Sequence, residues 1–172
     1  MRVLSRRKIR IAKPLIEDKF PLSEEGEVII QPATWRDLRP VVALEKVCFG
    51  RDSWPWPELL VALTFPGTIR LKSELGNQMV GFAIGDRRGR GDLGWVASIG
   101  VHPDYRRKGL GRELLAACEQ SLETHRVRLS LRKTNQGALE MYLQAGYSHV
   151  DLWSKYYKDG EDALVMERIV TA

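Results

Sequence analysis

Residues 98–112 read Ser-Ile-Gly-Val-His-Pro-Asp-Tyr-Arg-Arg-Lys-Gly-Leu-Gly-Arg, and the fold is interpreted outward from this stretch. An apolar run ends at Val101, Pro103 turns the backbone, and three basic residues lead into Gly109-Leu110-Gly111 at the start of an amphipathic segment. The free N–H groups and the dipole at a helix start favour negative charge. Glycines let a bulky anion approach the main chain, and basic side chains add charge-assisted contacts. The stretch therefore predicts a phosphate site between a strand and a helix.

The spacing of the glycines excludes two common phosphate motifs. No Gly-Lys-Ser/Thr follows them, so the stretch is not the P-loop of nucleotide triphosphatases. A single Gly-x-Gly also falls short of the dinucleotide-binding fingerprint. The alternative interpretation is a helix start with ordinary basic residues on its surface.

The segments around this stretch predict one α+β domain. Alternating apolar residues indicate strands over 27–30, 68–75, 78–85, 93–101, 127–132, 147–153 and 163–169. Apolar residues at helical spacing indicate helices over 35–48, from 57 to about 65, over 109–122 and over 136–145. This order favours a mixed sheet with helices on both faces. A glycine in the strand over 93–101 is a position that could allow a bulge.

The charge of the chain is concentrated at its N-terminus. The 172 residues contain 27 Lys and Arg against 22 Asp and Glu, a formal charge of +5. Residues 1–13 carry six of the basic side chains and no acidic one, so the other 159 residues are nearly neutral. The total charge therefore does not imply a basic nucleic-acid-binding face on the domain. We divide the chain into a basic extension over 1–26 and a domain over 27–172.

Cysteine usage and hydropathy exclude several other classes of protein. Cys48 and Cys118 belong to no CxxC or Cys/His cluster, so neither a zinc site nor a disulfide scaffold is indicated, and no metal is expected. No apolar run approaches the roughly 18 residues that a membrane span needs. The N-terminus lacks the apolar stretch of a secretory signal. We therefore expect a cytoplasmic protein.

Four blocks of sequence, in order, resemble the GNAT acetyltransferases, which bind acetyl-CoA. The central block is Arg106-x-x-Gly109-x-Gly111 after Val101-x-Pro103, and a second is Asn135-x-x-Ala138-x-x-x-Tyr142-x-x-x-Gly146-Tyr147. The remaining two resemble the RimI-like branch of N-terminal acetyltransferases: residues 155–166 with Lys155-Tyr156-Tyr157, and residues 48–60 with Pro55-Trp56-Pro57. The resemblance spans roughly 28–168 and implies a mostly antiparallel sheet. It leaves residues 1–26 outside.

The resemblance implies a set of cofactor-binding residues. The pantetheine arm of acetyl-CoA would lie beside the strand over 93–101, where a bulge separates two strands, against the main chain of Ile99, Gly100 and Val101. Asn135 matches a position near the sulfur of the cofactor and can cap a helix at the same time. The pyrophosphate would bind the amides of the loop and helix start, with contributions from Arg106, Arg107, Lys108, Gly109, Leu110, Gly111 and Arg112.

The implied reaction is direct attack of an amine on the acetyl thioester in a ternary complex. A backbone N–H of Ile99 or Val101 would stabilise the oxygen that gains charge. Tyr142, which also contacts the cofactor in this interpretation, matches the general acid that protonates the leaving thiolate. A core aromatic is the alternative role for Tyr142.

The general base is where this chain departs from the family. Aligning on Asn135 places Ser130 where the RimI-like branch has a glutamate, and Trp95 where a related eukaryotic branch has a tyrosine. Neither side chain serves as a base near neutral pH. The candidates left are Glu45, His102, a water chain, or an amine that arrives neutral. We take Glu45 first, and a solvent-facing helix carboxylate is its alternative role.

The acceptor implied by the resemblance is a protein or peptide N-terminus. Tyr156 and Tyr157 match positions that hold it, and Trp54 and Trp56 would wall its groove, with loop and core packing as their alternative role. Three other functions stay open: acetylation of a small amine or lysine side chain, a ribosome- or RNA-binding module that uses the basic tail, and a catalytically silent acyl-CoA-binding domain.

Overall fold

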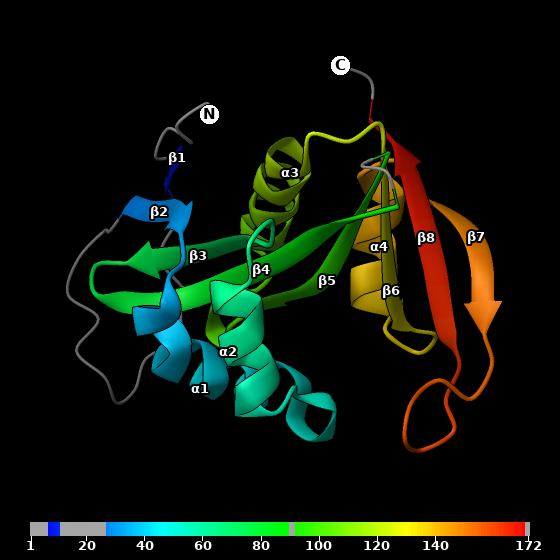
Figure 1. Ribbon diagram of the computed structural model, residues 1–172, viewed down its shortest axis with the longest axis horizontal. Helices are drawn as coiled ribbons and strands as arrows, with labels where there is room; N and C mark the ends of the chain where they lie inside the picture. Colours follow the sequence, from blue (N-terminus) through cyan, green and yellow to red (C-terminus); the bar gives the residue numbers. More distant parts are fainter. Residues whose placement is uncertain (1–6, 11–26, 90–91, 171–172) are drawn as a thin grey trace.

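An eight-stranded sheet organises the chain, with the strand order β1-β2-β3-β4-β5-β6-β8-β7 (Figure 1). The computed structural model describes residues 7–10, 27–89 and 92–170. The strands are β1 (Arg7–Arg10), β2 (Glu27–Pro32), β3 (Ile69–Leu75), β4 (Gln78–Arg88), β5 (Leu93–Val101), β6 (Arg126–Arg132), β7 (Ser148–Trp153) and β8 (Ala163–Ile169). Only β5 and β6 pair in parallel, and every other described neighbour is antiparallel. The predicted mixed, mostly antiparallel sheet is confirmed.

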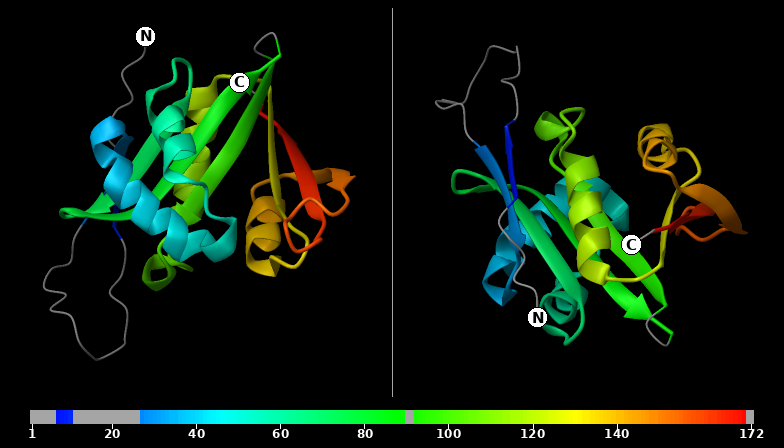
Figure 2. Two further views of the ribbon diagram at one scale, coloured as in Figure 1. Left: turned by 60° about the horizontal axis from the view of Figure 1, so that its bottom comes forward. Right: turned by 90° about the horizontal axis from the view of Figure 1, so that it is seen from above.

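Helices cover both faces of this sheet, as predicted. The α-helices are α1 (Leu38–Phe49), α2 (Trp56–Thr64), α3 (Leu110–Leu122) and α4 (Gln136–Gln144), and short 3-10 turns are η1 (Trp35–Asp37), η2 (Gly50–Asp52) and η3 (Pro103–Tyr105). Helices α1 and α2 lie on one face, and α3 and α4 lie on the other (Figure 2). Each face has its own apolar core, one around Leu114 and Leu129 and one around Leu44, Leu59 and Phe82.

The first helical segment is divided in two by local chemistry. Thr34 and Asp37 form a reciprocal capping box around η1, and α1 starts afresh at Leu38. Pro40 stands in the first turn of α1, where the N–H that it lacks would have had no intrahelical partner. The expected helix over 35–48 is therefore a 3-10 turn followed by an α-helix.

The parallel strands β5 and β6 separate as they run towards their C-terminal ends. Their pairing extends only from Leu93 opposite Arg126 to Val96 opposite Leu129. On its other side, β5 has an extra residue, Ala97, because Val96 and Ser98 pair with consecutive residues of β4. Figure 1 shows the two strands diverging below this point. The bulge therefore lies at Ala97, and not at a glycine of this strand or at Ile99–Val101, where the family resemblance placed it.

The basic N-terminal extension contributes one strand to the sheet. Strand β1 pairs antiparallel with β2, with Ile9 opposite Val28, and makes an edge of the sheet. An exposed ion pair joins Lys8 Nζ to Glu27 Oε2 at 3.0 Å, and such pairs contribute little stability. Residues 1–6 and 11–26 lie outside the described residues, so the division at residue 26 stays a prediction.

In the described part of the chain, no helix has the length and apolar character needed to cross a membrane. The thiols of Cys48 and Cys118 are both free.

Candidate active site

The loop between β5 and α3 presents unbonded amides at the start of a 13-residue helix. Gly109 is the N-cap of α3, and its φ of +83° is one that glycine adopts without strain. Among the residues that the structure describes, no side chain caps this end, and the first helical bond runs from the N–H of Glu113 to the carbonyl of Gly109, 3.1 Å away. The N–H groups of residues 110–112 therefore have no intrahelical partner. This geometry fits the anion site that the sequence predicts.

The basic side chains of the same loop take different positions. Arg106 Nε donates to the carbonyl of Val101 at 3.0 Å, and Lys108 Nζ lies 5.3 Å from the ring centre of Tyr105. Arg112 donates to Gln144 on α4, and Arg107 is exposed with a left-handed φ of +61°. All four belong to the loop that joins β5 to α3 or to the first turn of α3. Binding of a phosphate by these side chains stays a prediction.

One edge of β5 faces the gap left by β6. The N–H of His102 donates to Val80 on β4, and main-chain groups of successive strand residues point to opposite edges. The N–H groups of Ile99 and Val101 therefore point away from β4, towards the opening beyond the last β5–β6 pair. The Val101 carbonyl accepts from Arg106 and from Cys48 Sγ, at 3.4 Å. The open strand edge thus lies at Ile99–Val101, and binding of the cofactor there stays a prediction.

Helix α4 supplies the other two predicted cofactor residues. The Asn135 side chain accepts a hydrogen bond from the N–H of Ala138 at 3.2 Å, which confirms its capping role. Tyr142 is buried in the α3–α4 core, with its ring 5.8 Å from that of Tyr147. Burial raises the pKa of Tyr142, and the Tyr157 hydroxyl adds to this effect, so Tyr142 stays protonated near neutral pH. A packing role for Tyr142 is confirmed, and its role as an acid stays a prediction.

Glu45 is not the solvent-facing helix carboxylate that its alternative role assumed. Its side chain is only 1 % exposed, enclosed between α1, the loop before α2 and β5. One carboxylate oxygen accepts from the N–H of Trp54 at 3.2 Å, and the other from Ser98 Oγ at 3.3 Å. Burial raises the pKa of Glu45 to about 7, and both hydrogen bonds oppose the rise. A carboxylate with a pKa of about 7 that binds Ser98, the residue after the bulge, is suited to accept a proton.

The positions of the missing family bases lie on the same face as α1 and α2. Val127, Leu129 and Leu131 of β6 pack into the α3–α4 core, so the alternate residues Ser130 and Arg132 face the other way. Trp95 is 7 % exposed and stacks on Trp153, with ring centres 5.6 Å apart and planes inclined by 5°. Two stacked indole rings thus occupy the place where the related branch has a titratable tyrosine.

His102, the other side chain considered as a base, caps η3. Its Nδ1 accepts from the N–H of Asp104 at 3.4 Å. In the ranges that the structure describes, no three His, Cys, Asp or Glu side chains gather in a way that could hold a metal ion.

The predicted acceptor residues lie in two places, the tyrosines in the β7–β8 connection and the tryptophans just before and at the start of α2. Tyr156 is 55 % exposed and lies against both Trp153 and Tyr157. Trp54 donates its backbone N–H to the carboxylate of Glu45, and Trp56 is 59 % exposed at the start of α2. Both tryptophans therefore lie on the α1–α2 side, and only Trp56 is largely open to solvent; their role as walls of a peptide groove stays a prediction.

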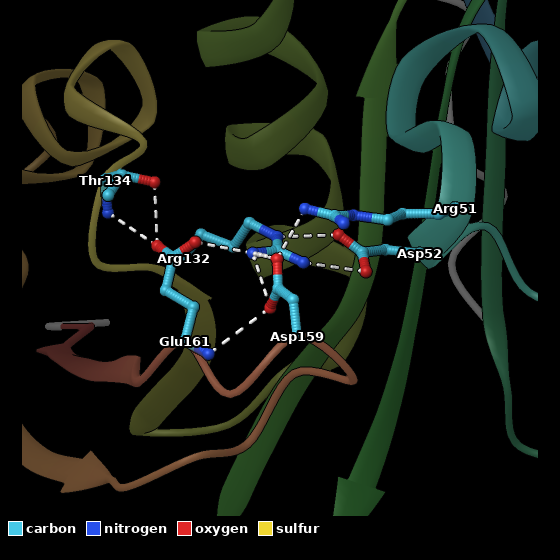
Figure 3. A network of polar contacts seen from close by, with 6 residues as sticks. All are labelled: Arg51, Asp52, Arg132, Thr134, Asp159 and Glu161. Carbon is cyan, nitrogen blue, oxygen red and sulfur yellow. Dashed lines mark hydrogen bonds and ion pairs between the residues drawn. The ribbon is translucent and has the colours of Figure 1, made fainter.

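Sequence reasoning missed Arg132, which joins the two sides of this region. Its guanidinium binds Asp52 of η2 and both Asp159 and Glu161 of the β7–β8 connection (Figure 3). It also lies 4.1 Å from the ring centre of Tyr157. The only signal in the sequence was acidic residues in two distant loops, and nothing in their spacing indicates one shared partner.

Comparison with known proteins agrees with this geometry. Residues 38–147 match the Acetyltransferase (GNAT) family. The chain is 33% identical over 145 residues to the N-alpha-acetyltransferase RimI of Mycobacterium tuberculosis, covering 82% of this chain and 92% of that protein. It is 29% identical over 148 residues to the catalytic subunit NAA10 of the N-terminal acetyltransferase A complex of Arabidopsis thaliana, covering 82% and 77% of the two chains.

A solved structure has the same fold. The ribosomal-protein-S18-alanine N-acetyltransferase of Escherichia coli superposes with a TM-score of 0.76 and 25% identity, covering 84% of this chain and 95% of that one.

The burial of Glu45 predicts a pH-dependent stability. Its pKa is raised from 4.5 to about 7 in the folded protein, so between these pH values the folded state keeps a proton that the unfolded state has lost. Wild-type stability should therefore fall with rising pH across this window and level off above it. The free energy of unfolding of Glu45→Gln, minus that of the wild type, should therefore increase by on the order of 2–3 kcal/mol as the pH rises from about 4.5 to about 8, measured by urea unfolding.

The exposed Glu140→Gln on α4 serves as the control, and it should change stability by less than about 0.5 kcal/mol. A stability difference for Glu45→Gln that does not vary with pH would show that Glu45 is ionised throughout the range.

Proposed function

Because this chain belongs to the GNAT family of acetyltransferases, we propose that it acetylates the N-terminal α-amino group of a protein or peptide, with acetyl-CoA as the donor. The observation that carries the proposal is the divergence of β5 from β6, which leaves one edge of β5 unpaired. The uncapped start of α3 follows β5 in the chain, and Tyr156 and Tyr157 lie in the β7–β8 connection on the β6 side. A donor and an acceptor can thus approach the same strand edge from opposite sides. The relatives named above as N-terminal acetyltransferases support this choice of acceptor.

The donor side fits a long thioester that carries phosphates. The N–H groups of residues 110–112 would bind the pyrophosphate, with charge from Arg106, Arg107 and Lys108. Gly111 lies so close to α4 that a Cβ there would be 3.1 Å from Met141 Sδ, so glycine lets α3 begin beside α4. The edge of β5 at Ile99–Val101 would pair with the amides of the pantetheine arm. Acetyl-CoA supplies the acetyl group in activated form, as a thioester.

Glu45 is the proposed general base. The attacking amine must be neutral, and an α-amino group, with a pKa of about 7.7–8.0, loses its proton far more readily than lysine, at about 10.4. A carboxylate with a pKa of about 7 is matched to that transfer. Glu45 accepts from the backbone N–H of Trp54 and from the hydroxyl of Ser98, the residue after the bulge. A proton from the acceptor amine would therefore pass to Glu45 along the α1–α2 face of β5.

Two further groups complete the proposed reaction. As the amine attacks, the acetyl oxygen gains negative charge, and the N–H of Ile99 or Val101 would donate to it from the open edge of β5. Tyr142, held protonated by burial, would give its proton to the departing thiolate. Both groups sit on rigid elements, so they need little reorganisation during the reaction.

The proposed acceptor side is formed by Tyr156, Tyr157 and Trp56. The relative from E. coli is named for acetylating ribosomal protein S18. For this chain, a ribosomal acceptor and docking on the ribosome through the basic residues of 1–13 are part of the proposal. Residues 1–6 and 11–13 of that tail lie outside the described residues.

A peptide panel tests the acceptor class. The protein is incubated with acetyl-CoA and peptides that differ in their first residue, and free thiol is followed. Turnover should require a free N-terminus and disappear when that amine is blocked, even if a lysine remains in the peptide. Turnover confined to polyamines or aminoglycosides would overturn the proposal, and cofactor binding without turnover on any amine would indicate a silent domain.

Tyr142→Phe tests the general acid. Loss of its hydroxyl should slow thiol release by about 100-fold or more, since the thiolate then leaves unprotonated. Affinity for CoA and the melting temperature should change little. The matched control is Tyr147→Phe, which removes the bond from that hydroxyl to buried Glu119. The control should cost about 1–3 kcal/mol of stability and leave the chemical step intact. A loss of stability in Tyr142→Phe without slower thiol release would assign Tyr142 to packing alone.

Glu45→Gln tests the general base through the pH dependence of kcat. With saturating peptide, the wild-type rate should rise with pH through about 7, where Glu45 ionises. In Glu45→Gln the rate should drop by about 100-fold. Its remaining pH dependence should follow the acceptor amine, at about 7.7–8.0. An unchanged rate and profile would mean that the amine arrives neutral without help from Glu45.

A further inference from the structure

Arg132 binds three carboxylates that come from two separate loops. At the C-terminal end of β6, its Nε and one terminal nitrogen make a two-pronged contact with Asp52 of η2, at 2.6 and 2.9 Å. Its other terminal nitrogen donates to Asp159, at 3.0 and 3.2 Å, and to Glu161. The Arg132 side chain is only 18% exposed. A single guanidinium therefore joins the loop that precedes α2 to the connection between β7 and β8.

The carboxylates are held in turn by neighbouring groups, as Figure 3 shows. Arg51 binds Asp159 from the η2 side. Thr134, just after β6, donates its N–H and its hydroxyl to Glu161 at 2.9 and 2.7 Å. We call this set of Arg51, Asp52, Arg132, Thr134, Asp159 and Glu161 the clasp. Arg51 also joins the two loops, but its side chain is 72% exposed, whereas that of Arg132 is 18% exposed, so Arg132 is the main link between them.

The clasp also sets the position of a proposed acceptor residue. The Arg132 guanidinium lies over the ring of Tyr157, 4.1 Å from its centre. The N–H of Tyr157 donates to the carbonyl of Glu161, and the carbonyl of Tyr157 accepts from the N–H of Gly160. The ring and the backbone of Tyr157 are thus fixed by the same short segment that Arg132 binds.

Charge makes the clasp depend on arginine. Hydrogen bonds from Arg132 lower the pKa of Asp159, and hydrogen bonds from Thr134, followed by those from Arg132, lower the pKa of Glu161. Asp159 and Glu161 are therefore ionised near neutral pH, and without Arg132 they would lose the cation that they share. Lysine carries the same charge but cannot contact Asp52 with two donors while it binds the opposite loop and covers a ring.

We propose that Arg132 is a positioning residue that holds the η2 loop and the β7–β8 connection together as the two walls of the groove for an extended peptide acceptor. The proposal rests on the proposed function, because that function places the acceptor between these loops. Arg132 acts through Asp52, Asp159 and Tyr157. Its effect should therefore appear in peptide binding and not in binding of the donor.

Kinetics with a peptide acceptor give the first test. Arg132→Met should lower kcat/KM for the peptide by roughly 10- to 100-fold, mainly through a higher peptide KM, because the walls lose their alignment. KM for acetyl-CoA should stay within about twofold, since α3 and β5 are untouched. Arg132→Lys should resemble Arg132→Met. A lysine variant with wild-type peptide KM, or equal losses for both substrates, would overturn the proposal.

Arg128→Met is the matched control. Arg128 lies four residues earlier on the same strand and face, and its Nε binds Glu167 of β8 at 2.6 Å instead of the two loops. This variant removes a comparable ion pair and should keep the peptide KM of the wild type. A peptide KM raised as much as in Arg132→Met would show that any lost ion pair on β6 has this effect.

Hydrogen–deuterium exchange of the full chain gives a readout that does not depend on activity. Arg132→Met should increase exchange in both 50–55 and 155–162, Asp52→Asn should increase it mainly in 50–55, and Arg128→Met should change neither segment. Unchanged exchange in Arg132→Met would contradict the clasp even if activity fell. If the wild type acetylates no peptide, the proposed function fails, whereas increased exchange in both segments would still establish that Arg132 joins the loops.

Discussion

The separation of β5 from β6 is the constraint on which the rest of the structure depends. A sheet normally satisfies the main-chain groups along both edges of an inner strand. Here the extra residue Ala97 and the early end of pairing at Val96 leave one edge of β5 open within the sheet. We propose that a donor with amide groups along its arm pairs with the open part of this edge. The opening is therefore both a defect of the sheet and the place where chemistry is proposed.

Two faces of the sheet contribute different parts to that opening. The α3–α4 face supplies the uncapped helix start and the buried Tyr142, whose environment keeps its proton in place. The α1–α2 face supplies Glu45, which burial brings to a pKa of about 7. Tyr142, with a pKa well above neutrality, and Glu45, with a pKa of about 7, thus lie on opposite faces of the sheet. That separation suits a reaction which takes a proton on one side and returns one on the other.

Part of this site could be predicted from residues 98–112 and 135–147, because a helix start, its glycines and its cap are local features. The bulge was misplaced, since the family resemblance put it at Ile99–Val101, whereas the register of β4 against β5 puts it at Ala97. The burial of Glu45 was missed for a related reason. Helical periodicity shows which residues share a face, but not that the chain before α2 folds back and covers one of them with Trp54.

The sequence by itself determined the order of strands and helices from residue 27 onward, the uncapped helix start and the membership of a family, because these follow from periodicity and from short motifs whose chemistry is local. The tertiary structure alone decided the titration of Glu45 and the partners of Arg132. Both depend on groups far apart in the chain: Ser98 lies 53 positions from Glu45, and Asp52 lies 80 positions from Arg132. Desolvation and ion pairing act through space, so their strength is set only when the sheet has brought such residues together.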